Sequence, residues 1–164
     1  IGLNCGKMVT GNMGSEMRMN YTMMGDTVNL AARLESSAKQ YGVYNFVGEN
    51  IYEKTKREFV FRFLDFVKVK GKNIPVKVYE LVNSKKNINN KTLKLVQLFE
   101  KGLDKYYKKK WEDALTLFQK SEEMEEKFTS RNTNPSLIYI ERCKIFIEDP
   151  PDKNWDGVWT MTSK

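Results

Sequence analysis

The amino-acid sequence changes character at residues 83–91, and this change limits the folds that the chain can adopt. Before this polar stretch, short β-branched and aromatic runs alternate with helix-like runs and with glycines. Beyond it, the sequence is rich in residues that favour helices. Interleaved strands and helices indicate an α/β (α+β) layered fold, whereas the second pattern is typical of an all-α unit. We therefore predict an α/β domain over 1–82, a linker over 83–91 and a helical extension over 92–164.

The first part has a clear helix signal between strand-like segments. Asp26 is a suitable N-cap, Gly42 follows the predicted end, and an apolar stripe at helical spacing runs from Leu30 through Leu34 and Ala38 to Tyr41. The predicted elements are extended segments within 1–12, a strand over 19–24, a helix over 26–41, a strand over 43–47, a short helix over 50–57 and a hairpin over 59–70 and 75–82.

The second part is predicted to hold helices over 93–109, 111–128 and 135–147, with Asn134 capping the last. Six residues have the large-small-large spacing of a tetratricopeptide-type hairpin: Leu103, Tyr106, Tyr107, Trp111, Ala114 and Phe118. One such unit cannot bury its apolar face alone, so it should dock on the first part, on a second copy or on the third helix. Trp155 and Trp159 flank an Asp-Gly turn and are predicted to anchor the tail.

Composition excludes several kinds of chemistry. The chain has no histidine, which excludes Ser-His-Asp and Cys-His hydrolases and removes the commonest zinc ligand. Cys5 and Cys143 are too few and too far apart for a disulfide framework, which favours a reducing compartment. No apolar run approaches the roughly 20 residues that a membrane span needs. Because the chain opens with Ile1, we expect it to be a fragment, and an upstream membrane segment stays open.

The net charge of +7 is concentrated in the first part, where residues 1–90 hold 14 Lys and Arg against 8 Asp and Glu. A basic surface attracts nucleic acid, anionic lipid or a nucleoside triphosphate, and charge alone does not choose among them. The basic residues are scattered, and neither an aromatic-interleaved RNA motif nor a helix-turn-helix pattern is present. We therefore expect no nucleic-acid partner.

Four side chains are candidates for binding an anionic ligand. Asn29 and Arg33 lie at i and i+4 on the predicted helix, where an amide and a guanidinium can together hold a ribose oxygen and a phosphoryl group. Lys70 closes a strand at a turn, and the Thr22 hydroxyl can donate to or accept from a base edge. Taken singly, each pattern favours the plain interpretation: solvated residues on a helix, at a turn and on a strand.

A longer pattern connects these residues. Residues 20–36, NYTMMGDTVNLAARLES, closely resemble the signature of class III adenylate and guanylate cyclases. Residues 1–14 resemble the strand pair before that signature, and VKVKGK at 67–72 with VYEL at 78–81 resembles the family's closing hairpin. The resemblance covers about residues 1–82. The second part resembles the helical extension, ending in Trp-Asp-Gly-Val-Trp, that follows some bacterial members.

The resemblance implies a ferredoxin-like nucleotide cyclase core, of which this chain holds only part. Family domains pair head to tail with active sites at the dimer interface, so a homodimer is implied. The implied reaction converts ATP to cyclic 3′,5′-AMP and pyrophosphate. In it the ribose 3′-hydroxyl attacks the α-phosphate, assisted by two Mg²⁺ or Mn²⁺ ions. Such chemistry needs no histidine, in agreement with the composition.

By position, the resemblance gives each candidate a role. Asn29 would orient the ribose, Arg33 would stabilise charge on the α-phosphate, and Lys70 would meet the triphosphate. Thr22 occupies the purine-selecting position, where Thr favours ATP over GTP. The family's two metal-binding aspartates, and a second purine-selecting residue, lie upstream of the strand that begins here at Ile1. Asp26 and Asp65 do not match those positions, so no metal ligand is assigned and the ions are expected to be held by residues outside this chain.

These implications lead to one expectation and one alternative. We expect the C-terminal part of a cytoplasmic adenylate cyclase with an upstream sensor domain, and no cyclase activity from the isolated chain. The alternative is a catalytically inactive, cyclase-like scaffold that acts through its helical extension. Metal-ligating aspartates on the preceding strands would favour the enzyme, and substitutions there would favour the scaffold.

Overall fold

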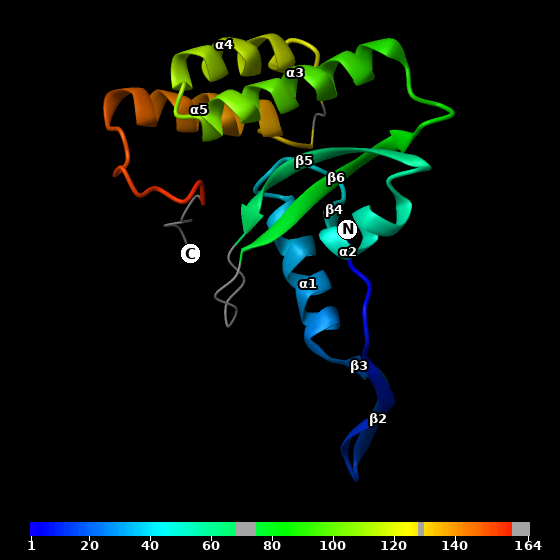
Figure 1. Cartoon of the computed structure of the whole chain (residues 1–164). Coiled ribbons are helices and arrows are strands. Elements are labelled where there is room, and N and C mark those ends of the chain that lie inside the picture. The colour runs from blue at the N-terminus through cyan, green and yellow to red at the C-terminus, as the bar shows by residue number, and fades with distance from the viewer. Residues whose placement is uncertain (68–74, 128–129, 159–164) are drawn as a thin grey trace.

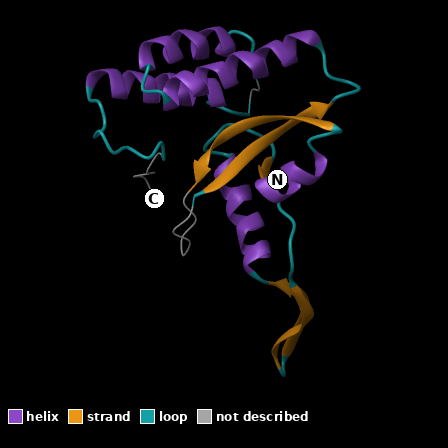
Figure 2. Ribbon diagram, viewed as in Figure 1, coloured by secondary structure: helices purple, strands orange, loops and turns teal. Residues whose placement is uncertain are grey.

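The computed structural model describes residues 1–67, 75–127 and 130–158. Up to residue 84 the described chain contains both strands and helices, and after it the described elements are helices (Figures 1 and 2). The elements are β1 (Gly2–Leu3), β2 (Val9–Ser15), β3 (Arg18–Met24), α1 (Asp26–Ala38), β4 (Phe46–Gly48), α2 (Glu49–Thr55), β5 (Phe59–Val67), β6 (Val76–Ser84), α3 (Asn90–Tyr107), α4 (Trp111–Glu122) and α5 (Pro135–Glu148).

Two separate sheets organise the first part. The four-stranded sheet has the order β1-β4-β6-β5, in which β1 pairs parallel to β4 and the other neighbours pair antiparallel. β2 and β3 form an antiparallel hairpin of their own, which projects away from the body of the molecule (Figure 1). Every residue of β3 is exposed, including Tyr21 and Met23, so this hairpin presents an apolar surface to solvent. The mixed α+β architecture agrees with the predicted fold class.

The alternation of side chains along the strands divides the core between the two faces of the four-stranded sheet. On one face, Val47 and Tyr79 pack with α2. On the other, Phe46, Leu64 and Val78 join a single cluster with residues of α1 and of all three C-terminal helices. Helices α3, α4 and α5 form a layer over β5 and β6 (Figure 1). The helical part therefore completes the same face that α1 covers, and the two parts share one hydrophobic core.

The start of α1 differs from its prediction. Gly25, with φ 144°, takes the N-cap position, and Asp26 lies in the first turn, where its charge suits the positive end of the helix dipole. The predicted apolar stripe is confirmed, since Leu34, Ala38 and Tyr41 are buried and Leu30 packs against them. The helix ends at Ala38, and the chain then turns through Gly42, whose φ of 64° favours glycine.

The helical part also differs in its bounds. β6 continues to Ser84 and α3 begins at Asn90, so the connection is shorter than the predicted linker over 83–91. α4 ends at Glu122 rather than near residue 128, because the chain turns there and brings Glu125 to a buried arginine of β5. α5 begins as predicted, with the Asn134 side chain accepting from the Leu137 amide. The tetratricopeptide-like character of this part stays a prediction.

Candidate functional site

Two of the predicted ligand-binding residues lie on the solvent side of α1. Asn29 and Arg33 are exposed, and the opposite side of the helix buries Leu34 and Ala38 in the shared core. The residues are one helical turn apart, so α1 brings them together on one face. One side of the helix is thus buried in the core, and the other presents the Asn29 amide and the Arg33 guanidinium at the surface.

The other two predicted residues lie on hairpins. Thr22 is exposed on β3, pairs with Gly11 of β2, and is followed after three residues by the start of α1. The hairpin and α1 are therefore adjacent, and Thr22 belongs to the same region of the fold as Asn29. Lys70 lies outside the described residues, so its predicted place at the β5–β6 turn is not tested.

The middle of α1 is held by close packing on β1. A Cβ added to Gly2 would lie 2.0 Å from the Ala31 carbonyl oxygen and 2.4 Å from the Glu35 amide nitrogen. Only a residue without a side chain allows this approach of strand to helix. Ala31 and Glu35 flank Arg33 in the sequence, so this contact fixes the segment that carries the guanidinium.

The end of α1 is held by a buried polar network. The Tyr41 hydroxyl donates to Asp65 Oδ2 over 2.6 Å, and Arg142 of α5 donates to the same oxygen over 2.6 Å. The Phe66 amide donates to the other carboxylate oxygen over 2.8 Å. Burial and the charge of Asp65 raise the pKa of Tyr41 above its ordinary value, so this hydroxyl stays protonated and donates.

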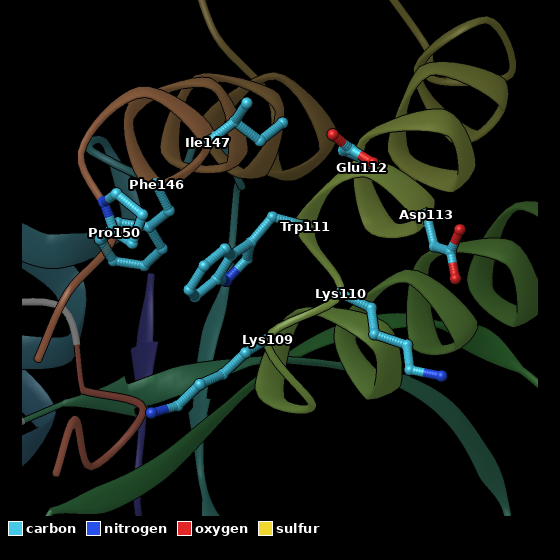
Figure 3. Close-up of a pocket in the computed structure, with 8 residues that line it drawn as sticks. All are labelled: Lys109, Lys110, Trp111, Glu112, Asp113, Phe146, Ile147 and Pro150. Carbon is cyan, nitrogen blue, oxygen red and sulfur yellow. The ribbon is translucent and has the colours of Figure 1, made fainter. Parts of the chain in front are cut away.

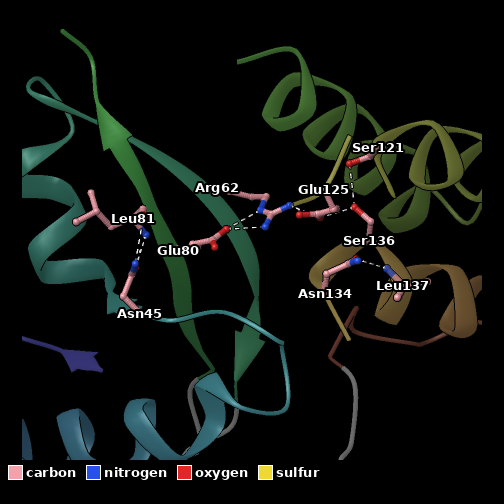
Figure 4. A network of polar contacts seen from close by, with 9 residues as sticks. All are labelled: Asn45, Arg62, Glu80, Leu81, Ser121, Glu125, Asn134, Ser136 and Leu137. Atoms are coloured by element: carbon pink, nitrogen blue, oxygen red, sulfur yellow. Dashed lines mark hydrogen bonds and ion pairs between the residues drawn. The ribbon is translucent and has the colours of Figure 1, made fainter. Parts of the chain in front are cut away.

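A second network joins β5, β6 and the segment after α4 (Figure 4). Arg62 is 3% exposed and forms ion pairs with Glu80 at 2.6 Å and with Glu125 at 2.5 Å. Ser136 of α5 donates to the same Glu125 oxygen over 2.8 Å. Burial raises the pKa of Glu80, and the Arg62 charge opposes that rise only in part. Two carboxylates thus share one guanidinium where the helical part meets the sheet.

The described residues do not fit the pair of divalent ions that the resemblance implies. They contain no group of three Asp, Glu or Cys side chains that could hold a metal. Asp65 is 1% exposed and already accepts from Arg142, Tyr41 and a backbone amide. Asp26 lies in the first turn of α1 without such a group around it. No step of the chemistry is therefore assigned to a metal held by these residues.

A separate pocket of about 480 Å³ lies between the start of α4 and the end of α5 (Figure 3). The Trp111 indole points toward Phe146 and Pro150, and Lys109 extends along one side. Lys109 Nζ donates to backbone carbonyls of the tail, including that of Lys153 over 2.8 Å. Trp155 packs edge-on against Phe146 with ring centroids 5.2 Å apart. Trp155 and the backbone of the tail therefore pack on the helical part, as predicted for Trp155. Trp159, the other predicted anchor, lies outside the described residues.

Sequence reasoning missed the residues that hold α1 in place. Tyr41 is predicted only as part of an apolar stripe, and Arg142 is assigned no role. A signal is present in the sequence: Arg62 and Asp65 are the only charged residues of β5, and buried charges are rare unless they are paired. In α5, Glu141, Arg142 and Lys144 all interrupt the apolar run, and the sequence does not show that Arg142 is the buried one. The charges in the apolar strand β5 therefore mark the buried ion pairs, although not their partners.

No helix among the described residues is both long and apolar enough to cross a membrane.

Comparison with known proteins agrees with the signature on β3 and α1. The family model of the adenylate and guanylate cyclase catalytic domain matches residues 1–83. The terminal-differentiation-specific adenylate cyclase of Dictyostelium discoideum is 36% identical over 148 residues, which cover 87% of this chain and 7% of that protein. Adenylate cyclase 1 of Rhizobium meliloti is 36% identical over 88 residues, covering 54% of this chain and 13% of that protein.

Among solved structures, the adenylyl cyclase CyaB of P. aeruginosa is 33% identical with a TM-score of 0.46, over 54% of this chain and 44% of that one. The chain thus spans a small part of the curated relatives that it matches. The D. discoideum alignment covers more of the chain than residues 1–83, so the sequence similarity continues into the helical part. The family match covers more than half of the sequence, and the chain belongs to the adenylate and guanylate cyclase catalytic domain family.

Proposed function

We propose that this chain supplies the substrate-orienting part of an adenylate cyclase, which converts ATP to cyclic 3′,5′-AMP and pyrophosphate. The observation that carries the proposal is the placement of Asn29 and Arg33 together on the solvent face of α1, within the segment that bears the family signature. Support for ATP comes from Thr22 and from the relatives, which are named adenylate cyclases.

Each residue has a role that its chemistry suits. The Asn29 amide, as donor and acceptor, binds ribose oxygens and orients the 3′-hydroxyl toward the α-phosphate. The Arg33 guanidinium keeps its charge and presents a planar fork of donors, so it stabilises the negative charge that builds on the α-phosphate during attack. Thr22 contacts the purine edge and favours adenine. Lys70 meets the β- and γ-phosphates as a point charge.

The projecting hairpin supports a proposal for the assembly. Met17, Tyr21 and Met23 of the β2–β3 hairpin are 97%, 74% and 53% exposed, and such apolar surface is typical of a protein interface. We place it in a head-to-tail homodimer of cyclase domains. Because the hairpin also carries Thr22, that dimer would bring a second copy close to the nucleotide site.

The divalent ions have no assigned ligands in this chain, so the proposal gives it the tasks of substrate orientation and charge stabilisation. We expect Mg²⁺ or Mn²⁺ to be held by residues outside this chain. We place the reaction in the cytoplasm, where ATP is available and where free thiols such as Cys5 and Cys143 persist.

The direct test is Arg33→Ala in an active cyclase assembly that contains this chain. Loss of a donor aimed at transition-state charge lowers kcat by about 100- to 1000-fold, with little change in the KM for ATP. Arg57→Ala is the matched control, because Arg57 is also exposed but lies beyond α2, away from α1. Equal turnover of the two variants would contradict the role of Arg33.

The scaffold alternative predicts a different outcome. A folded assembly with Mg²⁺ or Mn²⁺ and ATP that forms no cyclic AMP, yet still self-associates, would favour an inactive cyclase-like module. Cyclic AMP formation that depends on Arg33 would exclude it.

A further inference from the structure

The helical part and α1 meet where α1 ends. Both cover the same face of the four-stranded sheet, and the turn after α1 lies against the segment that leads into α5. A Cβ added to Gly42 would lie 2.0 Å from the Thr133 carbonyl oxygen and 3.0 Å from Asn134 Cα. The backbone of this turn therefore touches the start of α5 directly.

Side chains reinforce the same joint from inside the core. Tyr41, Asp65 and Arg142 are 1%, 1% and 4% exposed. Arg142 donates through one nitrogen to Asp65 over 2.6 Å and through another to the Tyr41 hydroxyl over 3.3 Å. Tyr41 donates to the same Asp65 oxygen. Tyr41 in the turn after α1, Asp65 of β5 and Arg142 of α5 thus form a closed triangle of charge-assisted hydrogen bonds.

This triangle constrains the position of α1. A buried carboxylate must keep its partners, because an unpaired charge in the core is costly, so the network has one favourable arrangement. Arg33 precedes the last residue of α1, Ala38, by five positions, which is about 7.5 Å along the helix axis. Tyr41 follows Ala38 by three residues, so the triangle anchors the chain just beyond the end of the helix that carries the guanidinium.

We propose that the helical part positions the nucleotide-binding helix, with Arg142, Asp65 and Tyr41 as positioning residues for Arg33 and Asn29. This inference rests on the function proposed above and extends it. The helical part holds the buried side of α1, opposite the face that carries Asn29 and Arg33. The triangle contains no residue that touches the substrate.

Two matched hydroxyl deletions test the inference. Tyr41→Phe removes the hydrogen bonds that join the turn after α1 to Asp65 and to Arg142, and it leaves the ion pair of Asp65 with Arg142 intact. Tyr139→Phe is the control, since its hydroxyl donates to the Leu64 carbonyl over 2.6 Å and joins α5 to β5 without reaching α1. Both side chains are at most 1% exposed, and both bonds end on adjacent residues of β5.

The first readout is hydrogen exchange of the α1 backbone amides in the 164-residue chain, which requires no activity. Loss of a hydrogen bond to a charged group should raise exchange at residues 34–38 by about tenfold in Tyr41→Phe. In Tyr139→Phe, α1 should change no more than the rest of the protein. Equal α1 exchange in the two variants would overturn the inference.

The second readout is turnover of an active assembly. Because small misplacements of a catalytic group are costly, Tyr41→Phe should lower kcat by about tenfold, with a smaller effect on the KM for ATP. Tyr139→Phe should keep the parent value. Faster α1 exchange with unchanged kcat would overturn the positioning role. If Arg33→Ala is itself harmless, the proposed function fails, and the exchange measurement alone then decides whether the helical part holds α1.

Discussion

Replacement of Arg142 by methionine removes the charge that balances Asp65 and keeps a long apolar side chain in its place. Asp65 is 1% exposed and lies 2.6 Å from the guanidinium, so the variant leaves a carboxylate buried without its cation. Breaking a buried ion pair in this way costs about 3–5 kcal/mol. That is a large share of the 5–15 kcal/mol, roughly, that stabilises a typical domain.

Urea unfolding of the 164-residue chain measures this loss. With a slope of about 2 kcal/mol per molar urea, the midpoint should fall by about 2 M. Trp111 and Trp155 pack in the helical part, whereas Asp65 lies in the sheet. Tryptophan fluorescence and far-ultraviolet circular dichroism should therefore give the same midpoint, because the two parts share one core.

A double variant separates the charge from the packing. Asp65→Asn combined with Arg142→Met removes both charges, so it should recover a large part of the stability lost in Arg142→Met alone. A loss below about 1 kcal/mol for Arg142→Met, as found for exposed ion pairs, would refute the reasoning. Separate fluorescence and dichroism midpoints would refute the shared core.

Three further predictions test other contacts. Burial raises the pKa of Glu80, so its contribution to stability is fully present below the ordinary pKa of the group and is lost as pH rises through the raised pKa. Urea titrations at increasing pH should therefore show Glu80→Gln gaining stability relative to the parent as pH rises above the ordinary pKa of a glutamate. The methyl group added in Gly2→Ala would overlap the α1 backbone and push β1 away from it. The free energy of unfolding, measured in the same assay, should fall by about 1–3 kcal/mol. Tyr21→Lys on the exposed hairpin should leave unfolding unchanged but weaken dimers in sedimentation, and full dimerisation would contradict that interface.

Local patterns predicted much of the fold. The stripe from Leu30 to Tyr41 identified α1 and its buried side, and Asn134 with Pro135 marked the start of α5. Both signals are local, because the residues that carry them belong to the helix concerned or directly adjoin it. Asn29 and Arg33 were predicted to share a face, and α1 places both on its exposed side.

Those local patterns did not predict the contacts between residues far apart in the sequence. Tyr41, Asp65 and Arg142 are separated by 24 and 77 residues, and no periodicity links them. The end of α4 was predicted too late for a similar reason: Glu125 leaves the helical path to pair with Arg62, 63 residues earlier. Helix propensity alone carries no information about such a partner.

The central claim, that α1 presents an amide and a guanidinium to a nucleotide, is tested most directly by a crystal structure of an active assembly with a non-hydrolysable ATP analogue. The account predicts the Arg33 guanidinium within about 3 Å of an α-phosphate oxygen and the Asn29 amide at the ribose. A nucleotide bound with both side chains pointing away from it would contradict the account.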